Sequence, residues 1–401
     1  MNDGSKFSLY TTILVLSILI TNSLNACQFQ NSVTDVLFSL DDMYSHNQYL
    51  IAYNPHAPIN INSNTDFESQ GFPGNGTLSD PYVISGFEIT TTQNCIQIEN
   101  TDAYFVISEC FLHGESFSGV HLVNVTNGVI FNNIISEKNS GVYSIHCSNI
   151  CILNNTISDN DTFGIHFSES SNSTLAHNFL SGSHTGAFAW DTSNLMVLNN
   201  TISESGGQGI FFIETPNSTI ANNTISENFA RGLEFGYATN CTFINNILSN
   251  NGEHGAVIES CEENLMVNNS ISGNNGTGLL LISSFDNIVH DNVLMENTGY
   301  GISCQYGSES NQIYLNILAF NELGNAVDNG TMNHWNTTGL GNYWSDYSGF
   351  GVYTIPGSAG SIDYHPFAYP ERFSNIILVV VAGIGFVAVL ILVLVIRFKK
   401  K

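Results

Sequence analysis

A glycine recurs every 22 or 23 residues over half of this sequence. The ten positions are Gly119, Gly141, Gly164, Gly186, Gly209, Gly232, Gly255, Gly278, Gly301 and Gly324. A repeat this short is a single supersecondary unit, and such a unit must stack on its neighbours because it cannot bury its own apolar face. The period therefore predicts a solenoid of about ten coils rather than a globular domain.

Each repeat contains three short segments with the alternation of β-strands. The first and third residues after most of these glycines are apolar, as in Ile165 and Phe167. Two more apolar columns follow, Ile130, Ile152, Leu175, Val197, Ile220, Phe243, Met266, Val289 and Ile313, then Ile135, Ile157, Leu180, Ile202, Ile225, Leu248, Ile271, Leu294 and Leu318. Three strands per coil leave no room for a helix, so we expect an all-β, right-handed, single-stranded parallel β-helix with inner columns spaced by about 4.8 Å.

An asparagine column separates the two apolar columns. Its members are Asn133, Asn155, Asn178, Asn200, Asn223, Asn246, Asn269, Asn292 and Asn316. Asparagine tolerates left-handed turns, and its amide can bond to the equivalent amide of the next coil. We therefore expect a turn with an asparagine ladder at this position.

Both ends of the chain predict export and membrane anchoring. Lys6 and the apolar stretch after it are typical of a signal peptide, residues 1–26. The apolar run 376–396 with the basic tail 397–401 predicts one transmembrane helix, and hence an extracellular domain on a cell membrane. The remaining domains are expected as an N-terminal cap region at 27–94, β-helix repeats at 95–330, an aromatic and glycine-rich cap at 331–367 and a linker at 368–375.

The charge balance excludes several partners. The net charge is −26 at pH 7, and Lys138, Arg231 and Arg372 are the only basic residues between the two hydrophobic ends. Nucleic acid binding needs many phosphate contacts from Lys and Arg, so no nucleic acid partner is expected. Uronate lyases and polygalacturonases need bases for the carboxylates of their substrates, which disfavours both.

Export also permits disulfides and glycosylation. Among the eight cysteines, the pairs Cys95–Cys110 and Cys147–Cys151 stay open. Thirteen Asn-x-Ser/Thr sequons occur, many as by-products of the asparagine column, and we expect a few to carry glycans.

Three motifs resemble a known family. They are the coil Asn-Asn-Thr-Ile-Ser-Glu-Asn at 222–228, the segment with Gly-Asn-Gly-Thr and Asp-Pro-Tyr-Val-Ile at 74–84, and Gly-Asn-Tyr-Trp-Ser-Asp-Tyr at 341–347 with its continuation to 367. Over residues 56 to 367 the chain resembles the NosD-type β-helix proteins, a carbohydrate-binding or sugar-hydrolase-like family of the cell surface and periplasm. Family members often carry an acidic insert in the last motif, whereas residues 349–353 here hold no carboxylate.

The resemblance implies a binding face on the strand after each glycine. Related β-helices bind glycans there, and aromatic rings can stack on the apolar faces of sugars. The predicted ligand-binding residues are His121, Tyr143, His166, Phe188 and Phe211, in five successive coils, with Trp190 beside them.

Carboxylates three residues further on offer a catalytic alternative. Glu169, Asp191 and Glu214 are expected on the same face, about 5 Å apart for neighbouring coils, a separation that suits a retaining glycosidase. The competing interpretation is that acids at a solvated edge keep the rod soluble and unpaired. A second acidic column, Glu137, Asp159, Glu204 and Glu227, is interrupted at Gly182 and favours a hydrated turn over a calcium array.

The family name also suggests copper, but the sequence predicts no metal site and no cofactor. The histidines His166, His177, His184, His254 and His290 are scattered over different faces. Three functions stay open: a non-catalytic surface rod that binds carbohydrate or a surface protein, a glycoside hydrolase, and an accessory factor for metal assembly. The oligomeric state is left undetermined.

Overall fold

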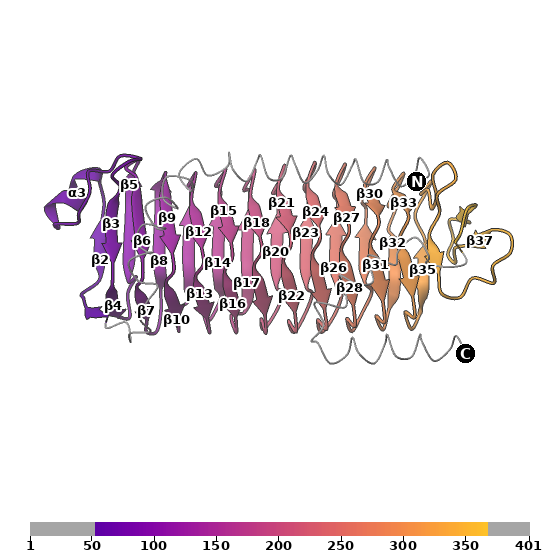
Figure 1. Cartoon of the computed structure of the whole chain (residues 1–401), viewed down its shortest axis with the longest axis horizontal. Coiled ribbons are helices and arrows are strands. Elements are labelled where there is room, and N and C mark those ends of the chain that lie inside the picture. The colour runs from indigo at the N-terminus through magenta and orange to yellow at the C-terminus, as the bar shows by residue number, and fades with distance from the viewer. Residues whose placement is uncertain (1–52, 368–401) are drawn as a thin grey trace, which may run out of the picture.

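The computed structural model describes residues 53–367, which wind into a long parallel β-solenoid with three sheets along its sides (Figure 1). The 13-stranded sheet contains β1 (Asn54–Pro55), β4 (Phe87–Thr90), β7 (Phe111–His113), β10 (Ile134–Ser136), β13 (Thr156–Ser158), β16 (Phe179–Ser181), β19 (Thr201–Ser203), β22 (Thr224–Ser226), β25 (Ile247–Ser249), β28 (Ser270–Ser272), β31 (Val293–Met295), β34 (Ile317–Ala319) and β36 (Tyr343–Trp344).

The other two large sheets are built in the same way. The 12-stranded sheet contains β2 (Ile59–Ile61), β5 (Ile96–Thr101), β8 (Ser118–Val125), β11 (Ser140–Ile145), β14 (Phe163–Ser168), β17 (Thr185–Trp190), β20 (Ile210–Ile213), β23 (Leu233–Gly236), β26 (Ala256–Glu259), β29 (Leu279–Ile282), β32 (Tyr300–Gln305) and β35 (Gly324–Asp328). The 11-stranded sheet contains β3 (Tyr82–Ser85), β6 (Phe105–Ser108), β9 (Gly128–Phe131), β12 (Cys151–Leu153), β15 (Thr174–Ala176), β18 (Met196–Leu198), β21 (Thr219–Ala221), β24 (Thr242–Ile244), β27 (Leu265–Val267), β30 (Ile288–His290) and β33 (Gln312–Tyr314). Each strand pairs with its equivalents in the coils before and after, which confirms the all-β parallel solenoid.

The stack is longer than the ten glycine-marked coils, so the expected coil count is too low. Ile96 of β5 pairs with Val120 of β8, so Cys95 stands where the next coil has Gly119. Further along, the glycine is a steric requirement. A Cβ atom on Gly141 would lie 2.5 Å from the carbonyl oxygen of Gly164 in the next coil.

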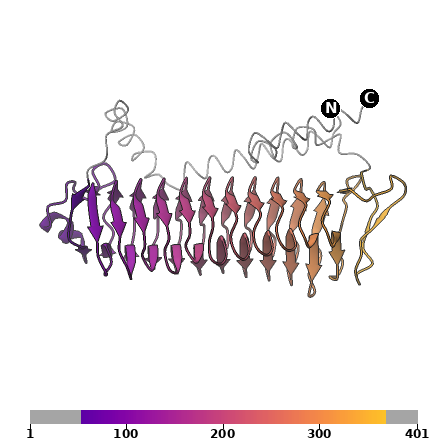
Figure 2. The ribbon, with the colours of Figure 1, turned by 90° about the horizontal axis from the view of Figure 1, so that it is seen from below.

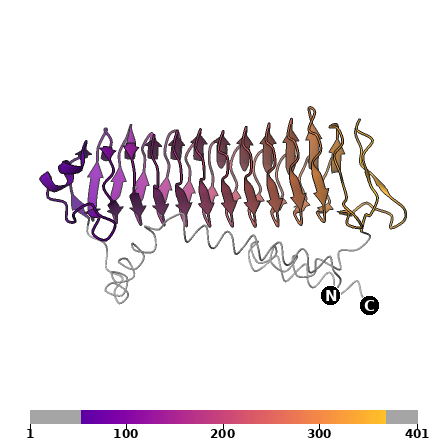
Figure 3. The same ribbon diagram turned by 90° about the horizontal axis from the view of Figure 1, so that it is seen from above.

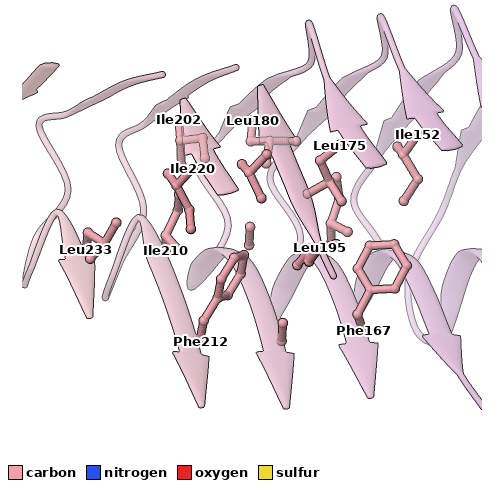
Figure 4. Packing of buried hydrophobic residues seen from close by; sticks show 14 of the residues in the cluster. Ile152, Phe167, Leu175, Leu180, Leu195, Ile202, Ile210, Phe212, Ile220 and Leu233 are labelled. Carbon is pink, nitrogen blue, oxygen red and sulfur yellow. The ribbon is translucent and has the colours of Figure 1, made fainter. Parts of the chain in front are cut away.

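The core consists of the predicted inner columns. Ile157, Ile202 and Ile225 are fully buried, and their side chains lie above one another along the 13-stranded sheet. Figure 4 shows Phe167 and Phe212 of the 12-stranded sheet pointing into the same interior. Apolar area removed from water in continuous columns therefore provides the main driving force for winding the chain.

The asparagine column forms the expected ladder. Asn200 donates from Nδ2 to Oδ1 of Asn223, and Asn223 donates in the same way to Asn246, each at 3.0 Å. The residue before each ladder asparagine adopts the left-handed conformation, as Asn222 does with φ 57°. The residue before each ladder asparagine therefore makes the turn, and the ladder asparagine bonds to the next coil.

Two further ladders were not predicted. One links Asn228, Asn251, Asn274, Asn297 and Asn321, and the other links Asn264, Asn287, Asn311 and Asn333. Buried amides thus bridge consecutive coils at three places around the solenoid.

The two ends of the stack are closed by different elements (Figures 2 and 3). At the N-terminal end, the helix α3 (Asn64–Ser69) places Phe67 in a stack on Tyr82 with ring centroids 4.7 Å apart. At the other end, β37 (Tyr353–Thr354) and β38 (Ile362–Asp363) form a small antiparallel pair. The buried Trp344 indole donates to Asp363 there, at 2.9 Å. Such caps cover apolar ends that would otherwise invite aggregation.

The structure tests the two predicted disulfide pairs, but it does not describe the two predicted terminal segments. Cys95, Cys110 and Cys147 are free and buried, so neither of the two disulfide pairs left open is formed. The signal peptide at 1–26 and the transmembrane helix at 376–396 lie outside the described residues. Between residues 53 and 367, no helix is long and apolar enough to cross a membrane.

Candidate functional site

Five aromatic side chains form one outward column on the 12-stranded sheet. His121, Tyr143, His166, Phe188 and Phe211 occupy equivalent positions in β8, β11, β14, β17 and β20, and each pairs in register with the next. Each lies between two inward residues of its own strand, because side chains in a strand alternate between faces. The sequence therefore placed these residues correctly relative to one another.

The rings contact each other along the whole column. His121 and Tyr143 stack nearly parallel with centroids 5.2 Å apart. Tyr143, His166, Phe188 and Phe211 continue edge to face at 4.4, 5.0 and 5.5 Å. These separations are the ones that aromatic pairs prefer, so each ring supports its neighbours.

Phe163 widens the column, although it was not among the residues predicted from the sequence. Its ring lies 4.8 Å from His166 and 4.9 Å from Phe188, so it contacts two rungs at once. The sequence signal for Phe163 is its position directly before Gly164. The predicted column contains only the second residue after each glycine, so Phe163 falls outside it. On the opposite side, Trp190 follows on the same outward face of β17 and leaves 42% of its surface exposed.

The column is uncharged near neutral pH. Burial lowers the pKa of His166 to about 4. Its Nε2 hydrogen bonds to the Ser168 hydroxyl, while Nδ1 has no partner within residues 53–367. Burial also lowers the pKa of His121, against the opposing effect of Glu99. Both imidazoles therefore act as neutral aromatic rings.

Polar groups mark the two ends of the column. At the first end, Gln97 pairs in register with His121, accepts a hydrogen bond from Asn94 and donates one to Glu99. These amide and carboxylate groups offer hydrogen bonds next to the apolar rings.

At the other end, Glu234 pairs in register with Phe211. Gln208 donates to its carboxylate at 2.9 Å, and Arg231 forms an ion pair with it. Arg231 also lies 3.4 Å from Glu253, so its guanidinium is shared between two acids.

The acids do not lie on the strand face as expected. Glu169, Asp191 and Glu214 each follow the last residue of a strand and adopt left-handed conformations with φ of 46°, 46° and 54°. Three residues past the aromatic position, the strand has already ended and the chain turns. All three are exposed, and Glu169 lies 3.4 Å from His146. Asp191 and Glu214 have no side-chain partner within the described part of the chain.

The surface of residues 53–367 is almost without positive charge. Lys138 is fully buried and donates from Nζ to the carbonyl oxygens of Thr91 and Gln93, at 2.8 and 2.9 Å. Arg231 is the only other Lys or Arg in this range. The candidate face is therefore aromatic and acidic.

The described residues do not provide a metal centre. No group of three or more His, Cys, Asp and Glu side chains converges between residues 53 and 367. The thiols of Cys95, Cys110, Cys147 and Cys261 are buried, which raises each pKa to about 11 and disfavours the thiolate that binds metals. Exposed turn acids such as Glu137 and Asp159 stand in a single column.

Comparisons with solved structures give the fold alone. The A-module of the mannuronan C-5 epimerase AlgE6 from Azotobacter vinelandii is 14% identical with a TM-score of 0.54, and the match covers 70% of this chain and 90% of that one. The AlgE4 A-module from the same organism is 12% identical, with a TM-score of 0.51 and coverage of 79% and 90%. The Dettilon tailspike protein is 14% identical, with a TM-score of 0.50 and coverage of 78% and 65%.

Two family profiles match overlapping parts of the sequence. Residues 23–202 match the right handed beta helix region, and residues 180–349 match the family described as periplasmic copper-binding protein (NosD). No curated protein gives a significant match. The two profiles agree with the observed solenoid: the chain is similar to the right handed beta helix region and, over residues 180–349, to the NosD family.

Proposed function

We propose that the outer face of the 12-stranded sheet between β8 and β20 binds carbohydrate, and that the protein is a non-catalytic binding rod. The observation that carries this proposal is the continuous column of aromatic rings in five successive coils, flanked by exposed Trp190. Flat rings with polar groups nearby suit the apolar faces and hydroxyl groups of sugars. An extended glycan lying across the rungs would contact several rings at once.

The charges favour a neutral glycan. A polyanionic chain would meet Glu99, Glu169, Asp191 and Glu214, while the nearest cation, Arg231, is already shared between two acids. Recognition of carboxylates or sulfates relies on free Arg and Lys side chains. The proposal therefore differs from the substrate named for the epimerases that share the fold.

The cell-surface location belongs to the same proposal. Its support is the apolar run at 376–396 followed by a basic tail. A rod held at a membrane by one end would present its whole binding face to the exterior, as an adhesion or capture protein needs.

A glycan array with the purified protein tests the binding role. Neutral glycans should bind, and Phe188→Ala with Phe211→Ala should weaken binding on the order of 30-fold, since each ring contributes about 1 kcal/mol. The matched control is Phe179→Ala, which removes an exposed aromatic ring from the 13-stranded sheet and should leave binding unchanged. No hits on the array would remove the carbohydrate proposal and leave a surface protein as the partner.

A glycoside hydrolase is the second candidate, because Glu169, Asp191 and Glu214 lie in three successive coils. The arrangement speaks against it, since a general acid needs a shielded carboxyl group and these three are exposed. Release of reducing sugar that is lost in Asp191→Asn would establish the enzyme. For a copper-assembly role, the described residues offer no fitting ligand set.

A further inference from the structure

One nitrogen atom in the middle of the aromatic column lacks a hydrogen bond. Nδ1 of His166 has no partner within residues 53–367 and is closed to solvent. The residue as a whole is only 9% exposed, although it lies on the outward face of β14. Buried polar atoms without a partner are costly and therefore rare, so this nitrogen requires a physical explanation.

Three aromatic rings enclose the imidazole of His166. Tyr143, Phe163 and Phe188 contact it edge to face, with ring centroids 4.4, 4.8 and 5.0 Å from its own. Tyr143 and Phe188 each pack on a further ring of the column, on the side away from His166. Both are therefore held in place from two sides.

Phe163 is the enclosing ring with the most freedom to move. Its equivalents in the coils before and after are Ser140 and Thr185, which are too small to hold a phenyl ring from either side. Within the described part of the chain, its ring contacts are with His166 and Phe188. Rotation about its side-chain bonds therefore leaves the packing of the column itself intact.

The imidazole chemistry of His166 indicates what Nδ1 can bind. Nε2 shares a hydrogen bond with the Ser168 hydroxyl, and either of these two atoms can donate. If Nε2 donates, Nδ1 carries a lone pair and needs a donor. If Ser168 donates, Nδ1 carries the proton and needs an acceptor. A hydroxyl group satisfies both forms, whereas a carboxylate or sulfate satisfies only the second, so the unmet bond fits a neutral sugar.

We propose that Nδ1 of His166 is the polar contact that orients a neutral sugar on the aromatic column, and that Phe163 is a movable cover over this nitrogen. The inference rests on the proposed carbohydrate binding and adds the atom that selects among sugars. In the free protein, the phenyl ring closes over the imidazole and keeps water away. A pyranose ring that docks on the column takes the place of Phe163, brings one hydroxyl to Nδ1 and lays an apolar face on Phe188.

This arrangement gives the column a basis for selectivity that stacking alone lacks. Aromatic rings accept the apolar face of many sugars, because stacking depends little on where each hydroxyl points. A buried nitrogen that needs one hydroxyl discriminates against a sugar that lacks the hydroxyl or carries it in the opposite configuration, since the nitrogen then stays unpaired.

Reaction of histidines with diethyl pyrocarbonate tests the cover on the full chain without any glycan. His166 should react slowly in the native protein, and Phe163→Ala should raise its rate several-fold, as measured by peptide mass spectrometry. The matched control is Phe211→Ala, which removes a ring of the same column that packs on Phe188 and should leave the rate unchanged. His146, whose side chain is 52% exposed, should react equally in all three proteins if the fold is intact. An unchanged rate for His166 in Phe163→Ala would overturn the cover.

Neutral oligosaccharides test the contact at Nδ1. Cellohexaose, mannohexaose and laminarihexaose are titrated by calorimetry into the native chain and into His166→Phe, which keeps an aromatic ring and removes both nitrogens. The variant should bind about tenfold more weakly, as expected for one lost hydrogen bond, and its affinities for the three probes should lie closer together. Equal affinities and equal selectivity would overturn the role of Nδ1 while leaving carbohydrate binding intact. Absence of binding to the native chain by all three would overturn this contact together with the proposed function.

Discussion

Replacement of one ladder asparagine should cost far more stability than its surface neighbour. Asn223 is buried, donates to the carbonyl oxygen of Val197 at 2.8 Å and to Oδ1 of Asn246 at 3.0 Å, and accepts from the backbone N–H and Nδ2 of Asn200 at 2.9 and 3.0 Å. Asn223→Ala removes all four hydrogen bonds. The Val197 carbonyl and the Asn200 amide are then left inside the protein without their partner.

The magnitude follows from those two orphaned groups. A buried backbone group without a partner costs about 1 to 3 kcal/mol, so the two groups together should make Asn223→Ala destabilise the fold by about 2 to 6 kcal/mol. Asn222 is exposed and left-handed, and Asn222→Gly keeps that conformation at a cost of only a few tenths of a kcal/mol. Comparison of Asn223→Ala with Asn222→Gly therefore separates the contribution of the ladder amide to stability from that of the turn residue in the same coil.

Urea unfolding followed by circular dichroism measures both changes. A lower midpoint with an unchanged slope for Asn223→Ala would mean that the whole stack loses stability as one unit. A reduced slope would show that the coils on either side unfold separately, as repeat arrays do when one interface fails. A loss below about 1 kcal/mol would refute the reasoning, because water would then satisfy the two groups as well as the amide does.

Three further predictions concern the core, the aromatic column and the C-terminal cap. Ile202→Ala should lower the free energy of unfolding by about 2 to 5 kcal/mol, while Ile134→Ala, on the exposed face of the same sheet, should lower it by less than about 1 kcal/mol in the same urea assay. Because the folded pKa of His166 lies below the unfolded value, the unfolded chain takes up the proton first as pH falls, and stability should drop by about 3 kcal/mol between pH 6.5 and pH 4. His166→Phe should remove that part of the pH dependence, and an unchanged profile would contradict the burial argument. Trp344→Phe, which leaves the Asp363 carboxylate without its indole donor, should lower stability by about 1 to 3 kcal/mol in thermal unfolding.

The sequence predicted the solenoid because its main constraint is periodic. A residue such as Ile157 must repeat its character in every coil if it is to stack on Ile135 and Leu180, so the inner columns are visible in one dimension. The count of coils fell short because the glycine is not present in every coil: Cys95 takes its place in the coil before Gly119.

Features that depend on where a strand ends were harder to predict from the sequence. Register put His166 beside Phe188, but the sequence did not show that β14 stops at Ser168 and leaves Glu169 in a left-handed turn. The burial of Lys138 could not be predicted from the sequence either, since its partners are carbonyl oxygens of residues 91 and 93, more than 40 positions earlier in the chain. Carbonyl acceptors carry no sequence signal at all.

The outer faces of the three sheets can differ from one another, because only the inner faces are subject to the same packing constraint. Inward residues must be apolar and stackable in every coil, whereas each outer face is independent of the other two. The 12-stranded sheet uses that freedom for an aromatic column, the 11-stranded sheet for a stripe of apolar side chains, and the 13-stranded sheet for short strands with many Ser and Thr residues. Only the first of these presents aromatic rings along several rungs, which is why binding is assigned to it.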